Sequence, residues 1–226
     1  MMAFPKTLLS LRFGSLATLV MLGLVLLLVG GCGNDRSLFD EGEPEESPAL
    51  TYKGLAGQKC AILVWADSRI RSEYNQVQVD LGRLLVADLA PKKEGEKPDP
   101  TGVQFIDPRS VVRFQREHPE FDGMAVTQVA PKLGAARVIY VEISELQTQS
   151  PRSILLLSGY AKATLRVVEV YDTEVKIAFE EPGITVHYPH NAPAGVVPND
   201  QVNEQSIYQG TLTSLASKLA ARLKVK

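Results

Sequence analysis

The sequence has little of the chemistry that marks the common classes of enzyme. It holds two cysteines, Cys32 and Cys60, and three histidines among 226 residues. The Gly-x-Ser-x-Gly, Ser-x-x-Lys, paired Cys-x-x-Cys and His-Glu-x-x-His motifs are absent, as is a phosphate-binding glycine loop. These absences disfavour catalysis, so we assign no catalytic residue, no metal site and no cofactor from the sequence.

Charge of one sign is also scarce in most of the chain. The formal net charge is −2, and residues 33–50 carry six acidic side chains against one arginine. Residues 51–226 are therefore nearly neutral, without the clustered basic face that nucleic-acid binding normally needs. We expect no nucleic-acid partner.

What the amino terminus does contain is the anatomy of an export signal. A short basic region with Lys6 and Arg12 precedes the apolar run at 16–30, and small residues follow. The run is about 15 residues long, whereas a membrane-spanning helix needs about 20. No twin arginine is present, which favours the general secretion route. The pattern predicts a signal peptide that is removed.

The end of this signal, Val29-Gly30-Gly31-Cys32, resembles the lipobox of bacterial lipoproteins. The resemblance implies cleavage between Gly31 and Cys32 and attachment of palmitate-type acyl chains to the Cys32 thiol. Two or more chains hold a protein firmly on a bilayer without spanning it. The alternatives are that Cys32 is a small apolar residue ending a helix, or that it pairs with Cys60 in a disulfide.

The lipobox also sets the expected domain organisation and location. Residues 1–31 would be the lipoprotein signal peptide, 32–56 the lipidated cysteine with an acidic flexible tether, and 57–226 a single domain. Gly33 stands where an aspartate would favour retention at the inner membrane. We therefore expect a lipid-anchored protein of the outer membrane that faces the periplasm.

Hydrophobic periodicity predicts alternating strands and helices after Gly57. Strands are expected at 60–67, 103–107, 136–146, 155–170 and 174–180, the last broken at Pro182-Gly183 before 184–188. Helices are expected at 72–90 with Ser72 as cap, at 108–117 after Asp107, at 121–135 interrupted by Pro131, and at 202–223. Residues 155–170 alternate, with Leu155 and Leu157 on the core-facing side.

These elements define the fold class as α/β with α+β character. We expect a mixed sheet of about five strands packed with amphipathic helices, in the order β-α-β-α-α-β-β-β-α. A strand, a crossover helix and a strand give parallel neighbours first, and strands joined by tight turns give an antiparallel meander afterwards.

Two places are candidates for binding. The segment HYPHNAPAGVVPND, residues 187–200, puts His187, Tyr188 and His190 in a proline-bearing loop. The two imidazoles could hold a metal with Asp200 as a distant third ligand, or the segment is a plain surface loop. Asp67-Ser68-Arg69 follows the first strand, where ligands gather in open α/β sheets, although helix capping explains it equally. Cys60 is expected to be a buried small residue.

Residues 58–224 have a further resemblance to known proteins. It is carried by the segments KCAILVWAD, VQFID, LGAARVIYVEIS and ATLRVVEVYDTEV and by a terminal amphipathic helix. They look like the small envelope domain shared by the penicillin-binding-protein activator lipoprotein LpoB, the curli secretion lipoprotein CsgG and the amino-terminal domain of TolB. This resemblance implies a protein that docks other envelope components.

The expected function is therefore that of a lipid-anchored, non-enzymatic binding or assembly module. Its partners would be the membrane, through the acyl chains on Cys32, and another envelope protein or a cell-wall component. The oligomeric state is left open. The alternative is an exported hydrolase or other enzyme with a site near Asp67 or in the His187 to Asp200 loop.

Overall fold

The computed structural model describes residues 51–90, 102–192 and 194–223. All described residues belong to one unit of the chain, Ala49–Lys226. The predicted signal, its cleavage site at Gly31 and the lipidation site at Cys32 lie outside the described residues.

The elements of this unit follow the predicted alternation. In chain order they are β1 (Lys59–Ala66), α2 (Ser68–Glu73), α3 (Val77–Leu89), β2 (Gln104–Phe105), α4 (Pro108–Glu117), the 3-10 turn η1 (Pro119–Gly123), α5 (Val126–Val129), the 3-10 turn η2 (Ala130–Leu133), β3 (Arg137–Ser150), β4 (Ser153–Val170), β5 (Val175–Tyr188) and α6 (Glu204–Ala220).

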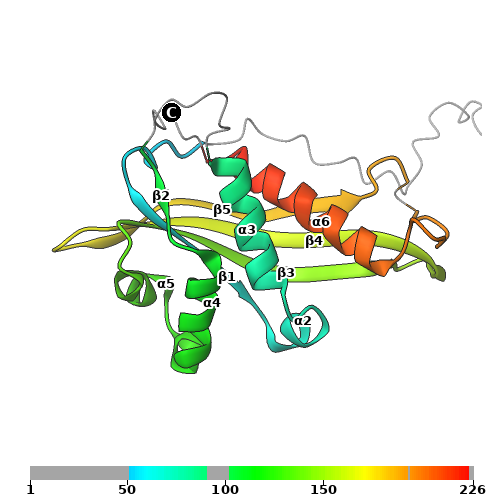
Figure 1. Cartoon of the computed structure of the whole chain (residues 1–226), viewed down its shortest axis with the longest axis horizontal. Helices are drawn as coiled ribbons and strands as arrows, with labels where there is room; N and C mark the ends of the chain where they lie inside the picture. The colour runs from blue at the N-terminus through cyan, green and yellow to red at the C-terminus, as the bar shows by residue number, and fades with distance from the viewer. Residues whose placement is uncertain (1–50, 91–101, 193, 224–226) are drawn as a thin grey trace, which may run out of the picture. The chain divides into compact units, whose positions relative to one another are not determined.

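The strands form one mixed sheet with the spatial order β2-β1-β3-β4-β5 (Figure 1). β1 pairs in parallel with both β2 and β3, whereas the β3–β4 and β4–β5 pairs are antiparallel. The predicted five-stranded mixed sheet, with parallel neighbours first and an antiparallel meander afterwards, is confirmed.

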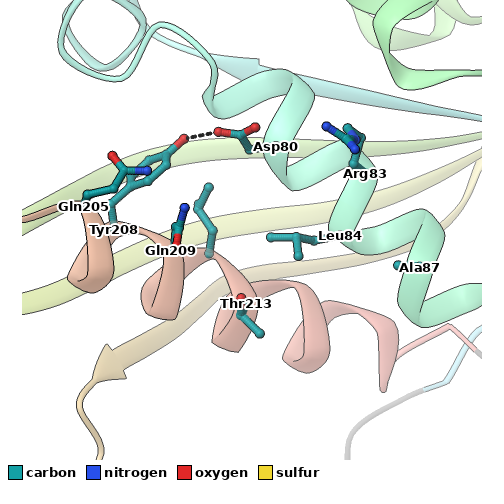
Figure 2. A pocket seen from close by; sticks show the side chains of 9 residues that line it. Asp80, Arg83, Leu84, Ala87, Gln205, Tyr208, Gln209 and Thr213 are labelled. Atoms are coloured by element: carbon teal, nitrogen blue, oxygen red, sulfur yellow. Dashed lines mark hydrogen bonds between the residues drawn. The ribbon is translucent and has the colours of Figure 1, made fainter. Parts of the chain in front are cut away.

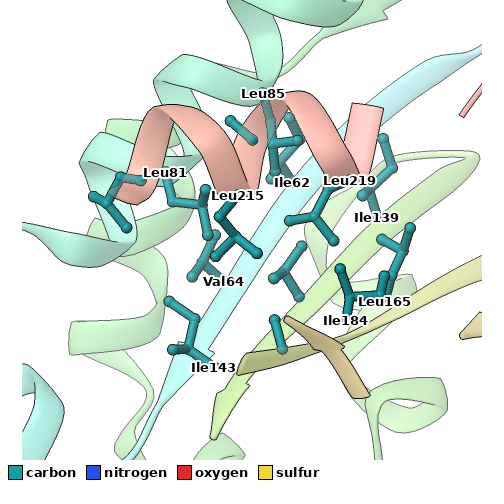
Figure 3. Close-up of a cluster of buried hydrophobic side chains, with 14 of the residues drawn as sticks. Ile62, Val64, Leu81, Leu85, Ile139, Ile143, Leu165, Ile184, Leu215 and Leu219 are labelled. Atoms are coloured by element: carbon teal, nitrogen blue, oxygen red, sulfur yellow. The ribbon is translucent and has the colours of Figure 1, made fainter. Parts of the chain in front are cut away.

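Two hydrophobic clusters lie on opposite faces of this sheet, and β1 contributes to both. Ile62 and Val64 belong to the larger cluster with α3 and α6, whereas Ala61 and Leu63 belong to the smaller one beside α4 and α5. Successive residues of a strand point to opposite faces, so a strand covered on both sides is apolar throughout. Figure 3 shows the larger cluster, with Leu215 and Leu219 of α6 facing β-strand residues.

Four sequence predictions are wrong in detail. The helix expected at 121–135 is only the four-residue helix α5, which lies between the 3-10 turns η1 and η2. The helix expected at 72–90 is two helices, α2 and α3, and Ser72 lies inside α2 instead of capping a helix. Pro182-Gly183 does not break the last strand, because the β4–β5 register shifts there and Gly183 takes a φ of 71°. A bulge of this kind absorbs an extra residue while pairing continues. Leu155, expected to face the core, is 74% exposed.

A buried polar network fastens the first described residues to the sheet. Tyr52 donates a hydrogen bond to Glu169 at 2.7 Å, and the Arg137 guanidinium donates to the Tyr52 hydroxyl at 3.0 Å. Tyr171 donates to the other oxygen of Glu169, also at 2.7 Å, and Lys176 lies 3.6 Å from it. Glu169 and Arg137 are each at most 9% exposed, so the carboxylate depends on these partners for solvation.

This network lowers the pKa of Glu169. Burial by itself raises the pKa, but the hydrogen bonds from Tyr171 and Tyr52 and the charges of Arg137 and Lys176 outweigh it and hold the pKa below the ordinary 4.5. The ionised form therefore stabilises the fold above the unfolded-state pKa. That contribution is lost as pH falls through the folded-state pKa.

We predict that Glu169→Gln lowers the free energy of unfolding by about 1.5–3 kcal/mol at neutral pH, because it removes charged hydrogen bonds and leaves Arg137 without its anion. Urea unfolding at several pH values measures this. The difference from the wild type should shrink as pH falls below 4.5. A difference that stays constant across that range would contradict the role of the charge.

Gly159 of β4 allows α6 to lie close to the sheet. A Cβ at this position would run into the side chains of Thr211 and Ile207 of α6. Thr211 is fully buried, and its hydroxyl donates to the Ile207 carbonyl at 2.7 Å, so it cannot move aside without losing that bond.

We predict that Gly159→Ala lowers the free energy of unfolding by about 1–3 kcal/mol, the usual cost of overpacking. Gly123→Ala is the matched control, because nothing lies within 4 Å of a Cβ there. Thermal and urea unfolding of both variants provide the test. Equal stability of the two alanine variants would show that α6 is not held against Gly159.

Candidate binding groove between α3 and α6

A groove of about 550 Å³ runs between helices α3 and α6 (Figure 2). From α3 it is lined by Asp80, Arg83, Leu84 and Ala87, and from α6 by Gln205, Tyr208, Gln209, Leu212 and Thr213. These positions recur three or four residues apart on each helix, which places them along one ridge. The groove is thus the space between two helices whose other ridges bury Leu81, Leu85, Leu215 and Leu219 in the core.

A hydrogen bond across the groove joins the two helices. The Tyr208 hydroxyl donates to the Asp80 carboxylate at 3.0 Å, as Figure 2 shows. The Tyr208 ring also stacks on Tyr74, with centroids 5.3 Å apart and planes 5° from parallel. The Tyr74 hydroxyl in turn lies 3.2 Å from the Thr148 hydroxyl of β3. The tyrosine pair therefore forms one end wall of the groove and ties it to the sheet.

Beyond the tyrosine pair lies a second hollow of about 300 Å³, which shares Asp80, Gln205 and Tyr208 with the groove. It adds polar groups from α2, from the turn before α3, from β3 and from α6: Glu73, Asn75, Gln76, Thr148 and Glu204. The surface therefore continues past the pair with carboxylate, amide and hydroxyl groups.

Burial keeps both tyrosines protonated. It raises the pKa of Tyr74 to about 12. It raises the pKa of Tyr208 well above the ordinary 10, and the adjacent Asp80 charge raises it further. Each hydroxyl therefore stays a hydrogen-bond donor at neutral pH. With Arg83, two glutamine amides and an aliphatic floor at Leu84, the groove presents the mixture that holds a ligand by non-covalent contacts.

Asp67 does not belong to this groove. Its carboxylate accepts a hydrogen bond from the Ile70 amide at 2.8 Å and caps α2. The capping interpretation of Asp67 is therefore confirmed. Asp67 is not among the residues that line the groove. Cys60 is fully buried, and burial raises the pKa of its thiol to about 11, which leaves it protonated and unreactive at neutral pH.

The histidine-bearing segment differs from the predicted loop. His187 and Tyr188 are the last two residues of β5, and the irregular segment starts after them. The His187 ring packs against Tyr160, with ring centroids 4.9 Å apart. His190 Nε2 lies 3.4 Å from the Ser214 hydroxyl of α6. The two imidazoles therefore have separate neighbours.

Tyr188 packs where Gly210 leaves room on α6, because a Cβ at Gly210 would meet the Tyr188 ring. Within the described residues no three His, Cys, Asp or Glu side chains are grouped so as to hold a metal ion. In the same part of the chain, no helix is both long enough and apolar enough to cross a membrane.

The groove was not predicted from the sequence. By helical spacing Tyr74 and Tyr208 fall on apolar helix faces, and Asp80 and Arg83 are ordinary surface residues. The available signal was the recurrence of polar residues on α6 beside its apolar stripe, at Gln205, Gln209 and Thr213. That signal does not indicate which neighbouring helix faces it.

Comparison with known proteins identifies no family. No family model matches the sequence, and no curated protein matches it either. Among solved structures, the PelC dodecamer from Paraburkholderia phytofirmans has 11% identity and a TM-score of 0.38, over 78% of this chain and 93% of that one. The hypothetical protein CT253 from Chlamydia trachomatis has 15% identity and a TM-score of 0.39, over 75% and 92%.

The lipoprotein GNA1162 from Neisseria meningitidis also matches, with 13% identity and a TM-score of 0.39, over 72% of this chain and 95% of that one. At these identities and scores the likenesses concern only the arrangement of strands and helices.

We predict that Tyr208→Phe lowers the free energy of unfolding by about 0.5–1.5 kcal/mol at neutral pH, because it removes the hydroxyl that binds Asp80. The folded-state pKa of Tyr208 is raised, so its contribution is complete below the unfolded-state value of 10. It is lost as pH rises through the folded-state value.

Urea unfolding on both sides of pH 10 tests this prediction. The wild type should lose more stability than Tyr208→Phe as pH rises past 10. If the alkaline loss of Tyr208→Phe matched that of the wild type, the hydrogen bond across the groove would not contribute.

Proposed function

We propose that this chain is a lipid-anchored protein of the bacterial cell envelope that binds another envelope component without catalysing a reaction. The observation that carries the proposal is the run Val29-Gly30-Gly31-Cys32 at the end of an export signal. Signal anatomy and lipobox are independent features, and they agree on Cys32 as the lipidated residue. Gly33 in place of an aspartate favours the outer membrane, with the domain on the periplasmic side.

The groove between α3 and α6 supports a binding role. Its ends are fixed by packing and by the Tyr208–Asp80 hydrogen bond, so the side chains around it are already in place before a ligand arrives. A preformed surface loses little conformational entropy on binding. Arg83 and Gln209 are exposed at its rim, while Leu84 is half-buried between them. An apolar strip with a polar rim is the usual anatomy of a protein-binding site.

The charges favour a protein partner over a nucleic acid. Asp80 and Arg83 bring opposite charges to the same groove, so a polyanion would meet a carboxylate there. A polypeptide segment offers both signs of charge as well as apolar side chains. We therefore infer that a protein of the envelope is the partner.

We predict that the wild-type chain incorporates radiolabelled palmitate during growth and that Cys32→Ala does not, because the acyl chains are attached to this sulfur. Cys60→Ala is the control and should label like the wild type, since Cys60 is fully buried. Autoradiography of the immunoprecipitated chain gives the readout. Label retained by Cys32→Ala, or absent from the wild type, would contradict the anchor.

We predict that a photo-crosslinking amino acid at Arg83 or Gln209 captures the same envelope protein in growing cells. At Arg113, which is exposed on α4 outside the groove, it should capture none. The two capture sites come from different helices, so one shared product indicates the groove itself. Mass spectrometry identifies the product.

A second substitution makes this test specific. Leu84→Glu puts a charge on the apolar strip and should abolish the crosslink from Gln209, whereas Arg109→Glu on α4 should leave it intact. Unrelated products from the two positions, or a product that survives Leu84→Glu, would exclude the groove as the binding site.

A further inference from the structure

The β3–β4 hairpin ends in a group of exposed aliphatic side chains, which we call the apolar tip. Ile154 is 89% exposed, Leu155 74% and Val197 69%. They come together because Leu157 and Val196 exchange two backbone hydrogen bonds, of 2.9 and 2.8 Å. This bridge brings the segment after β5 alongside the start of β4, and its antiparallel register puts Val197 opposite Leu156.

The tip is exposed because helix α6 does not reach it. Leu157 is only 6% exposed, whereas Leu155, two residues nearer the turn, is 74% exposed. α6 begins at Glu204, and Gln149, the strand partner of Leu157, contacts that residue. The part of the hairpin that α6 covers therefore ends between Leu157 and Leu155. The hairpin continues beyond that point.

Both faces of the hairpin are apolar at the tip. Successive residues of a strand point to opposite faces, so Ile154 and Leu155 expose aliphatic side chains on opposite sides. A partner protein that lay against one face would leave the other in water. A medium that surrounds the hairpin, such as the acyl region of a bilayer, covers both.

The charges at the tip suit a lipid surface. From Leu146 to Val168 the sequence contains no carboxylate. Lys162 and Arg166 in this stretch pair with glutamates of β3 and β5. Arg152 remains at the turn itself, exposed, where a cation favours the anionic headgroups of a membrane.

The first described residues of the chain are held at the other end of β3. Tyr52 binds Glu169, which pairs with Arg137 at the start of that strand, and β3 of 14 residues spans about 45 Å. Eighteen residues lie between Cys32 and Thr51, and the nineteen steps from one Cα to the next reach at most about 65 Å when extended. A chain anchored at Cys32 can therefore bring the tip to the same bilayer, where the tether makes even a weak contact effective.

We propose that the apolar tip inserts into the bilayer interface as a second membrane contact, an inference that rests on the proposed anchor at Cys32. The acyl chains would hold the domain near the membrane, and the tip would orient it. The groove between α3 and α6 would then be presented in a fixed direction.

Depth-dependent fluorescence quenching tests the insertion. Ile154→Cys in the full chain, purified from membranes, is labelled with bimane and placed in phosphatidylethanolamine and phosphatidylglycerol vesicles with brominated acyl chains. Thr173→Cys, exposed in the β4–β5 turn at the far end of β4, is the control. We expect a blue shift and a roughly twofold loss of emission at 154, as for a group a few ångströms into the interface, and no loss at 173.

A second variant keeps the result specific to the tip. Bimane at Val197→Cys should be quenched in the wild-type background and lose that quenching when Ile154 and Leu155 are both serine. Absence of quenching at 154 in a vesicle-bound chain would overturn the insertion. An emission change that follows protein concentration and not bromine would also overturn it, because the tip would then contact another protein copy.

Different results contradict the proposed anchor and the proposed insertion of the tip. A chain that takes up no palmitate contradicts the proposed anchor, while the bromine quenching of that same chain still reports whether its tip enters lipid. A palmitate-labelled chain without quenching at 154 leaves the anchor intact and removes the tip as a membrane contact.

Discussion

The close approach of α6 to β4 at Gly159 is the contact on which the other features of the domain depend. Without a side chain at Gly159, Thr211 and Ile207 of α6 settle directly against the strand. This fixes the height and direction of α6 over the sheet. The apolar stripe of the helix then closes the larger core, and its next ridge faces α3 across the groove (Figure 2).

The extent of α6 determines what the rest of the sheet leaves open. The helix has 17 residues, about 26 Å at 1.5 Å per residue, whereas β4 has 18 residues and spans about 60 Å. A helix of this length cannot cover such a strand. The uncovered end is the apolar tip, and the opposite end is fastened instead by Glu169 and its polar partners. Two distinct surfaces, groove and tip, therefore follow from one helix seated on a longer hairpin.

The sequence predicts the fold well where one physical rule dominates. The continuous apolar run of β1, the Asp107-Pro108 start of α4 and the alternation of β4 from Gly159 to Val167 each follow from local rules of burial or capping, and each is confirmed. The split between α2 and α3 was missed because apolar spacing continues through the break, and because the true cap, Asp67, precedes the predicted start. The Pro182-Gly183 pair predicts a break, although pairing with β4 carries β5 through it as a bulge.

The binding surfaces were harder to predict, because both depend on contacts between distant segments. Tyr208 binds Asp80 across 128 positions of sequence, and no local pattern identifies such a partner. Leu155 falls on the core-facing side only if alternation in β4 is unbroken, and the β3–β4 register shifts between Tyr160 and Leu157 and again between Leu157 and Ser153. His187 and His190 stand close in sequence, but the end of β5 between them gives their rings different neighbours.

Membrane attachment through Cys32 is the central claim, because it places both the groove and the tip at a bilayer surface. Intact-mass measurement of the protein extracted from its native membrane tests this most directly. We predict a polypeptide that begins at Cys32 and carries the added mass of a diacylglyceryl group, with or without a further acyl chain on the new amino terminus. An unmodified polypeptide, or one that begins at another residue, would contradict it.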